Sequence, residues 1–260
     1  MELTQWGSKQ LVQTSDNNQI LTNVANRYTA LADSSNSCCG EGENGYANNS
    51  PEYDTEELSL LIPTVTEVSA GCGNPLTISS IRLNETVVDL GSGGGIDCFL
   101  ASKQTGPNGK VYGVDMTPAM INLANKNKAK LGIKNVEFIK NQIDQTNLPS
   151  ESVDVILSNC VINLVPDKTK VFEEAFRILK TQGRLQICDI VLSENLPDEA
   201  LTDENWCHCL SGALLKDNYL EAIYNAGFTS VNTVSERVYQ PESEHEWMSS
   251  VYSVSILAIK

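Results

Sequence analysis

From residue 85 onward the chain alternates short apolar runs with amphipathic stretches, and this alternation is the feature that most restricts its fold. The segments between the runs predict helices at 95–104, 118–131 and 167–180, and a mainly helical stretch follows at 198–226. Strands that alternate with helices form a mainly parallel sheet with helices on both faces. The chain is therefore predicted to be an α/β protein of the Rossmann-like type with a seven-stranded sheet. The predicted strands are 86–90, 110–115, 136–139, 153–158, 183–189, 230–239 and 250–259.

A length of 260 residues suits one α/β domain with additions. We divide the chain into an N-terminal extension, residues 1–69, and a cofactor-binding domain, residues 70–260. Within the extension, apolar spacing at 20–31 predicts an amphipathic helix. Residues 33–51 are rich in glycine and asparagine and contain two adjacent cysteines, and this composition predicts a mobile loop.

Composition and charge exclude several classes of function. The net charge of −15 argues against nucleic-acid binding, since no basic patch is available to displace counterions from phosphates. No apolar run approaches the roughly 18 residues of a membrane-spanning helix, and no signal peptide is recognised, so a cytoplasmic protein is expected. No large apolar face is evident, and a monomer is expected. The eight cysteines then indicate metal-binding, redox or catalytic thiols rather than disulfides, although their spacing does not suit zinc.

A glycine loop follows the first strand of the alternating region. Gly91, Gly93 and their neighbours stand between a predicted strand and a predicted helix. Glycines let the backbone take positive φ and approach a ligand closely, and open α/β sheets bind ligands at this end of their strands. The loop alone is a weak signal, because a plain tight turn explains it equally well.

Polar residues after the next two strands strengthen the case for a nucleoside-containing cofactor. Asp115 ends the second strand, where a carboxylate accepts ribose hydroxyls, although it also suits a helix cap. Gln142 and Ile143 follow the third strand, where an adenine would lie, and a solvated loop is the alternative. The loop departs from G-x-G-x-x-G, because the sixth position is not glycine. Asp89 at the first strand suits a cationic ligand. S-adenosylmethionine, which carries an ammonium and a sulfonium, is therefore the predicted cofactor.

Three separated cysteines lie beside this predicted cofactor site. Cys72 precedes the first strand, Cys160 stands at the tip of the strand at 153–158, and Cys209 lies in the helical stretch downstream. Each alone is compatible with an ordinary buried thiol. Together they would offer soft sulfur ligands, which bind soft centres.

The chain resembles the arsenite S-adenosylmethionine methyltransferases in their short microbial form, which are class I methyltransferases. The resemblance covers roughly residues 20–235. It is carried by the segments 37–40, 71–75, 88–97, 113–118, 158–164, 166–168 and 209–214, of which Asp-Met-Thr and Ser-Asn-Cys-Val-Ile-Asn-Leu are the most specific.

The resemblance implies methylation of thiol-bound arsenite in arsenic detoxification. It implies that Cys72, Cys160 and Cys209 bind As(III), the last from an insertion around 195–217. The resemblance also implies that Met116 and Asn159 lie at the cofactor. Asn159 would lie beneath the methyl group or serve as a structural amide. Cys38 or Cys39 would take part in redox chemistry or substrate delivery.

Three thiolates around As(III) would leave a lone pair that attacks the S-methyl group without a general base, so catalysis is mostly positioning. Neighbouring charge or glycine-loop dipoles are expected to lower the thiol pKa values. Methylation oxidises the arsenic formally, which implies a small-thiol or thioredoxin-type reductant as partner. Two alternatives remain: a class I methyltransferase acting on a carbon, oxygen or nitrogen acceptor, and a thiol module that sequesters arsenic without catalysis.

Overall fold

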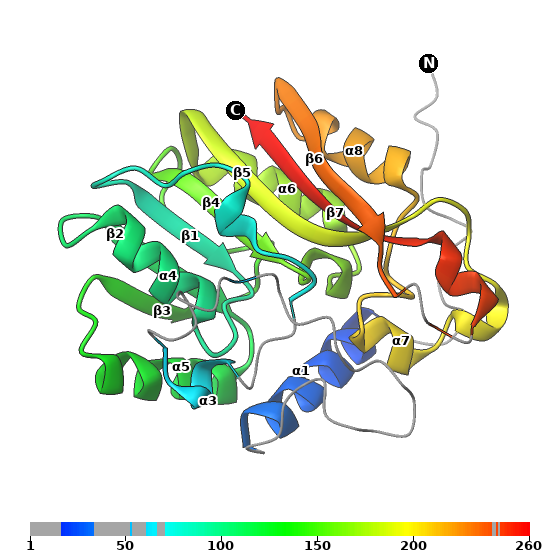
Figure 1. Ribbon diagram of the computed structural model, residues 1–260, viewed down its shortest axis with the longest axis horizontal. Coiled ribbons are helices and arrows are strands. Elements are labelled where there is room, and N and C mark those ends of the chain that lie inside the picture. Colours follow the sequence, from blue (N-terminus) through cyan, green and yellow to red (C-terminus); the bar gives the residue numbers. More distant parts are fainter. Residues whose placement is uncertain (1–16, 34–52, 54–60, 67–70, 241–242, 244) are drawn as a thin grey trace.

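A computed structural model describes residues 17–33, 53, 61–66, 71–240, 243 and 245–260. They form a seven-stranded sheet in the order β3-β2-β1-β4-β5-β7-β6 (Figure 1). β1 to β5 pair in parallel, and β7 runs antiparallel to both of its neighbours. The predicted class I methyltransferase fold is confirmed. The strands are β1 Thr86–Leu90, β2 Lys110–Asp115, β3 Val136–Lys140, β4 Val153–Asn159, β5 Leu179–Leu192, β6 Ser230–Val238 and β7 Val251–Ile259.

Seven α-helices and four 3₁₀ turns accompany the sheet among the residues that the structure describes. The α-helices in the described part of the chain are α1 Asn17–Asp33, α3 Pro63–Thr66, α4 Ile96–Thr105, α5 Pro118–Leu131, α6 Lys168–Ile178, α7 Asp203–Cys207 and α8 Lys216–Asn225. The 3₁₀ turns are η1 Pro75–Thr77, η2 Ile162–Leu164, η3 Asp198–Ala200 and η4 Glu246–Ser250.

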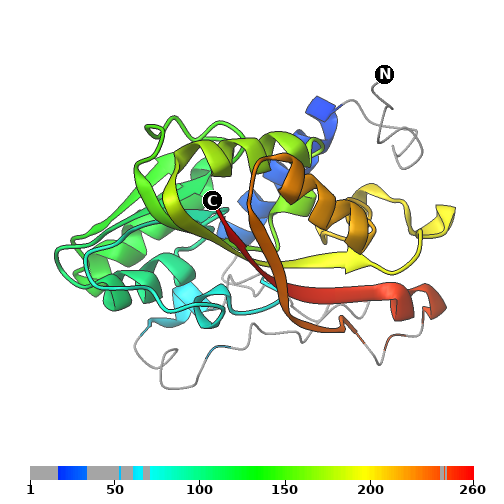
Figure 2. The same cartoon turned by 90° about the horizontal axis from the view of Figure 1, so that it is seen from above.

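The central strands are buried on both faces, and their side chains alternate between two cores. Val88 and Leu90 of β1 pack in one apolar cluster with residues of α6 and α8. Val87 packs in another cluster with residues of α4. Figure 2 shows α6 and α8 on one side of the sheet and α4 on the other. This two-sided burial explains why β1 is an almost continuous apolar run.

Two predicted boundaries were wrong. The predicted helix at 167–180 ends at Ile178, and the strand predicted at 183–189 extends over Leu179–Leu192. The extension continues the pairing with β4 across a register shift, which apolar periodicity does not reveal.

The stretch at 198–226 is mainly helical, as predicted, but it is interrupted between two short helices. α7 ends at Cys207, and helix resumes only at Lys216. Cys209 adopts φ 65°, its N–H bonds to Trp206 O, and the Leu210 N–H bonds to Asn205 O. These bonds are the two of a Schellman motif, which ends a helix at a left-handed residue that is usually glycine.

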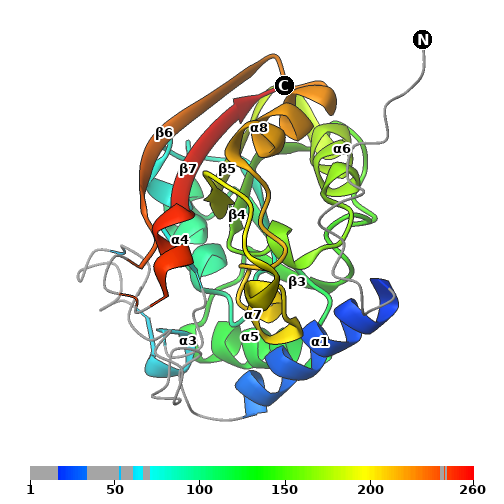
Figure 3. The ribbon, with the colours of Figure 1, turned by 90° about the vertical axis from the view of Figure 1, so that its right-hand side faces the viewer.

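α1 confirms the helix predicted at 20–31 and lies at the ends of the strands beside α5 and α7 (Figure 3). The loop predicted at 33–51 lies outside the described residues, apart from residue 33, as do Cys38 and Cys39. The division at residue 69 stays a prediction. Among the described residues, no helix combines the length and apolar content needed to cross a membrane.

Candidate active site

A cavity of 260 Å³ lies at the carboxyl ends of β1, β2, β3 and β4. This edge of the sheet is where α/β proteins bind ligands, because loops after adjacent parallel strands converge there. Seven of the eight predicted cofactor residues line the cavity: Gly91, Gly93, Asp115, Met116, Gln142, Ile143 and Asn159.

The glycine loop takes the shape that the sequence predicted. Gly91 and Gly93 have φ 73° and 48°, in the region that favours glycine. A Cβ on Gly91 would overlap Val161, whereas one on Gly93 would meet no atom within 4 Å and would point into open space. The carboxylate of Asp115 holds the loop, because it accepts hydrogen bonds from Gly93 N at 3.0 Å and Thr117 N at 2.8 Å.

Asp89 is the predicted cofactor residue that does not line the cavity. It is buried and accepts a hydrogen bond from Cys98 Sγ at 3.3 Å, and burial together with the nearby Asp97 raises its pKa well above the ordinary value. Asp97 lines the cavity instead and accepts a hydrogen bond from Tyr53 Oη at 2.7 Å. Sequence reasoning missed both residues. The position of Asp97 in the first turn after the glycine loop was an available signal, whereas Tyr53 carried none.

The cavity lining fits a cationic cofactor. Four aspartates line it against one lysine: Asp97, Asp115, Asp144 and Asp167, with Lys170. The buried Ser92 hydroxyl in the glycine loop has no hydrogen-bond partner among the described residues. An acidic lining and an unused hydroxyl suit a ligand that carries both positive charge and polar groups, as the predicted S-adenosylmethionine does.

α1 forms one wall of this cavity, which sequence reasoning did not foresee. Leu21, Val24 and Tyr28 of α1 are among the lining residues. Two polar contacts attach α1 to the segment that carries Cys209. Asn23 Nδ2 donates to Asp203 Oδ2 at 3.0 Å, and Arg27 Nη2 lies 2.6 Å from His208 Nε2.

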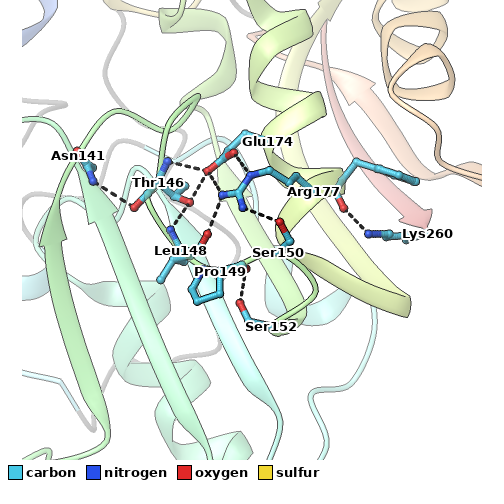
Figure 4. Close-up of polar contacts among 10 residues, drawn as sticks. Asn141, Thr146, Leu148, Pro149, Ser150, Ser152, Glu174, Arg177 and Lys260 are labelled. Carbon is cyan, nitrogen blue, oxygen red and sulfur yellow. Dashed lines mark hydrogen bonds and ion pairs between the residues drawn. The ribbon is translucent and has the colours of Figure 1, made fainter.

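The loop after β3, which carries Gln142 and Ile143, is attached to α6 by a network of polar contacts (Figure 4). Glu174 accepts hydrogen bonds from Thr146 N at 2.8 Å and Thr146 Oγ1 at 2.5 Å, and it forms an ion pair with Arg177. Arg177 Nη2 in turn donates to Leu148 O at 2.7 Å. The network fixes the loop that forms the far side of the cavity.

The structure brings together the three predicted arsenic ligands. Cys72, Cys160 and Cys209 are 0%, 5% and 3% exposed and belong to one cluster, although they come from distant parts of the chain. The thiol of Cys209 donates a hydrogen bond to Cys160 O at 3.0 Å. Of the three cysteines, only Cys160 lines the cavity. Cys160 therefore stands where the cofactor cavity meets the thiol cluster.

Two of these cysteines have left-handed backbone conformations. Cys160 has φ 53° and Cys209 has φ 65°. Such conformations cost a residue with a side chain roughly 1–2 kcal/mol each relative to glycine. At both positions the strained conformation places a thiol where glycine would leave none, which is typical of functional sites.

Asn159 fixes the segment that carries Cys72. Its Oδ1 accepts a hydrogen bond from Cys72 N at 3.1 Å, and its Nδ2 donates to Gly73 O at 2.8 Å. Cys72 O is held separately by Ser253 Oγ at 2.9 Å and by Arg237 Nη2 at 3.1 Å. Asn159 thus lines the cavity and positions the first cysteine of the cluster, and its place beneath the methyl group stays a prediction.

The expectation that the surroundings lower the thiol pKa values was wrong. Burial, with hydrogen bonds from Cys209 and Cys72, raises the pKa of Cys160 well above its ordinary value. The hydrogen bond with Cys160 lowers the pKa of Cys209, but burial together with the nearby Asp189 and Cys72 outweighs it, and the net shift is upward. Both thiols are therefore protonated at neutral pH until a ligand displaces their protons.

A buried carboxylate that sequence reasoning missed lies next to two of the thiols. The sulfur atoms of Cys160 and Cys209 and a carboxylate oxygen of Asp189 all lie within 4.8 Å of one another. Burial raises the pKa of Asp189 to about 6. Burial also lowers the pKa of the neighbouring Lys168 to about 8. The signal was present in the sequence as an aspartate near the predicted end of the fifth strand.

The remaining described cysteines have simpler places. Cys98 and Cys188 are fully buried, and Cys207 is 8% exposed at the end of α7.

Comparison with known proteins agrees with this geometry. The family described as "Methyltransferase domain" matches residues 81–227. An arsenite methyltransferase of Halobacterium salinarum is 38% identical over 223 residues, which are 80% of this chain and 57% of that protein. The human arsenite methyltransferase is 40% identical over 174 residues, 63% of this chain and 46% of that protein.

A solved structure gives the same result. The crystal structure of an arsenic(III) S-adenosylmethionine methyltransferase from Chlamydomonas reinhardtii is 31% identical, with a TM-score of 0.66 over 80% of this chain and 71% of that chain. This chain belongs to the arsenite methyltransferase family. It spans about half the length of the curated relatives described above. In this chain the cavity and the thiol cluster meet at Cys160.

Proposed function

We propose that this chain transfers methyl groups from S-adenosylmethionine to trivalent arsenic held by Cys72, Cys160 and Cys209. The observation that carries the proposal is the double position of Cys160, which lines the cofactor cavity and belongs to the buried thiol cluster. An acceptor bonded to this sulfur faces the cavity directly. Three thiols are a donor set for a soft centre and not for a carbon, oxygen or nitrogen acceptor.

The residues around the cavity divide the binding of the cofactor among them. Asp115 at the end of β2 would accept the ribose hydroxyls, and Ile143 would pack on the adenine. The glycine loop would let the backbone approach the methionine part, where Asp97 offers charge to the ammonium. Bound S-adenosylmethionine supplies a methyl group that its sulfonium already makes electrophilic. The protein therefore needs no general base for the transfer.

Arsenic binding at the thiols is a ligand exchange that conserves protons. Each protonated cysteine replaces one hydroxyl of arsenous acid; one arsenic–sulfur bond forms, one arsenic–oxygen bond breaks, and the thiol proton leaves in a water molecule. The raised pKa values of Cys160 and Cys209 do not prevent this exchange, because the departing hydroxyl takes the proton. Burial of the three sulfurs keeps the bound arsenic away from bulk water.

The wider cellular setting belongs to the same proposal. Arsenic becomes formally oxidised on methylation, so turnover requires electrons from a small thiol or a thioredoxin-type protein. We expect the substrate to arrive as a thiol complex of arsenite, and the enzyme to act as a cytoplasmic monomer in arsenic detoxification.

The test uses purified protein with S-adenosylmethionine, arsenite and a thiol reductant, and arsenic species are separated by chromatography and identified by mass. Methylated arsenic is expected from the wild type. Cys160→Ser should yield none while it still binds S-adenosylhomocysteine with wild-type affinity in calorimetry. If the wild type binds the cofactor product but methylates no arsenic, the acceptor is a different small molecule and the arsenic assignment fails.

A further inference from the structure

A carboxylate with no part in the proposed transfer lies inside the thiol cluster. Asp189 is fully buried, and its oxygen lies within 4.8 Å of the sulfurs of both Cys160 and Cys209. Strand register accounts for the approach. The Cα atoms of Asn159 and Cys188 are paired across β4 and β5, so the next residue on each strand, Cys160 and Asp189, emerges at the same level. Cys72 does not belong to this close group.

The carboxylate of Asp189 is held by three hydrogen bonds. Its Oδ1 accepts hydrogen bonds from Asn163 Nδ2 at 2.9 Å and from Ile190 N at 2.8 Å. Its Oδ2 accepts one from Tyr219 Oη at 3.0 Å. The buried ammonium of Lys168 is close enough to compensate its charge electrostatically. Each carboxylate oxygen accepts two hydrogen bonds, so among the described residues one acceptor position of Oδ2 has no donor.

The chemistry of ligand exchange indicates what this position receives. When two thiols have replaced two hydroxyls of arsenous acid, the arsenic keeps one hydroxyl, and that hydroxyl is a hydrogen-bond donor. Cys160 and Cys209 are the two sulfurs in the close group, and the third member of that group is an oxygen acceptor rather than Cys72.

Building on the proposed function, we propose that Asp189 accepts the hydrogen bond of the hydroxyl that arsenic retains while it is bonded to Cys160 and Cys209. Asp189 is then a specificity-determining residue, because it favours trivalent arsenicals that still carry a hydroxyl at this stage over those whose third substituent is an organic group. The exchange is completed when the thiol of Cys72 replaces the last hydroxyl, which leaves as water with the thiol proton. No electrons are transferred in these steps.

The test measures binding without the cofactor, so it does not depend on turnover. In a parent that carries Cys72→Ser together with Cys38→Ser, Cys39→Ser and Cys207→Ser, the proposed ligands that remain are Cys160 and Cys209, so arsenite bonded to them must keep one hydroxyl. Phenylarsonous acid, which has two hydroxyls, loses both on bonding to the same two thiols. Quenching of tryptophan fluorescence reports both events, because Trp206 is buried in the same cluster.

Asp189→Asn in this parent should weaken arsenite binding about tenfold or more, as expected for the loss of a hydrogen bond to a charged group. Phenylarsonous acid should bind within threefold of the parent. Tyr219→Phe is the matched control: it removes one buried hydrogen bond to Asp189 but leaves the carboxylate, so the ratio of the two affinities should stay at the parent value. Asp189→Ser serves as a second variant and should change the ratio in the same direction.

An equal loss of affinity for both arsenicals in the Asp189 variants would show that the carboxylate only supports the fold of the cluster, and the inference would be wrong. Unchanged binding of both arsenicals would overturn it as well. If the parent and the wild type bind neither arsenical although both bind S-adenosylhomocysteine, the arsenic assignment itself fails, which is a different result from a failure of Asp189 alone.

Discussion

Truncation of Glu174 tests whether the loop at the far side of the cavity is held by the network in Figure 4. Glu174 is 9% exposed and accepts two hydrogen bonds from Thr146 and two from Arg177. In Glu174→Ala the buried N–H of Thr146 loses its acceptor, at a cost of about 1–3 kcal/mol. The lost pair with Arg177 contributes about 1 kcal/mol at most, because the arginine side chain is 40% exposed. The free energy of unfolding should fall by about 3 kcal/mol.

The assay is urea denaturation followed by circular dichroism, with Arg177→Ala and the double variant measured in parallel. The slope of the free energy of unfolding against urea should be unchanged in Glu174→Ala while the midpoint falls. The double-mutant cycle should give a coupling energy of about 1 kcal/mol between the two residues.

The reasoning would be refuted by a loss below about 1 kcal/mol in Glu174→Ala. Such a result would mean that water satisfies Thr146 as well as the carboxylate does, and that the loop is held by its apolar contacts alone. A coupling energy near zero, with a large loss in the single variant, would refute only the contribution of the ion pair. Glu173→Ala, which alters a glutamate beside Glu174 on α6, should cost less than about 0.5 kcal/mol and serves as the control.

Three further predictions concern pH, the glycine loop and the thiol cluster. Burial raises the pKa of Glu174, but its hydrogen bonds outweigh burial and leave the pKa below the ordinary value of 4.5. The stability that the ionised Glu174 contributes should therefore be complete above pH 4.5 and lost as pH falls through the lower pKa of the folded state. The difference in urea midpoint between the wild type and Glu174→Gln should shrink between about pH 5 and pH 3. Gly93→Ala should fold but bind S-adenosylhomocysteine at least tenfold more weakly in calorimetry. Gly91→Ala should instead lower the melting temperature, because only the Cβ at Gly91 would overlap a neighbouring side chain. The opposite pattern would contradict the assignment of the cavity. Asn159→Ala should lower the free energy of unfolding by about 2–3 kcal/mol and speed the reaction of Cys72 with a thiol reagent, since both hydrogen bonds from Asn159 to the Cys72 segment are lost. An unchanged rate of modification would show that Ser253 and Arg237 hold the Cys72 segment without Asn159.

The parts of the site that follow strands in the sequence could be predicted from it. A glycine loop after an apolar run, and the residues at the ends of the next two strands, indicated five residues of the cavity lining: Gly91, Gly93, Asp115, Gln142 and Ile143. Met116 and Asn159 followed only from the resemblance to a family. The strand ends are informative because parallel strands with helical crossovers must bring their carboxyl ends to one edge of the sheet. Asp89 was misplaced for a related reason: side chains alternate along a strand, and Asp89 contacts Cys98 of α4 instead of lining the cavity.

The amino-acid sequence by itself determined the class of fold, the position of the cofactor loop and the identity of the cysteines, because periodicity, glycine and soft sulfur ligands are local properties. Only the tertiary structure decided which groups meet. It placed Asp189 beside Cys160 through strand register, gave Cys209 a left-handed conformation just after α7, and laid α1 over the cavity. It also raised the pKa values of Cys160 and Cys209, which local reasoning expected to be low, since burial depends on what the rest of the chain packs around a residue and not on its neighbours in the sequence.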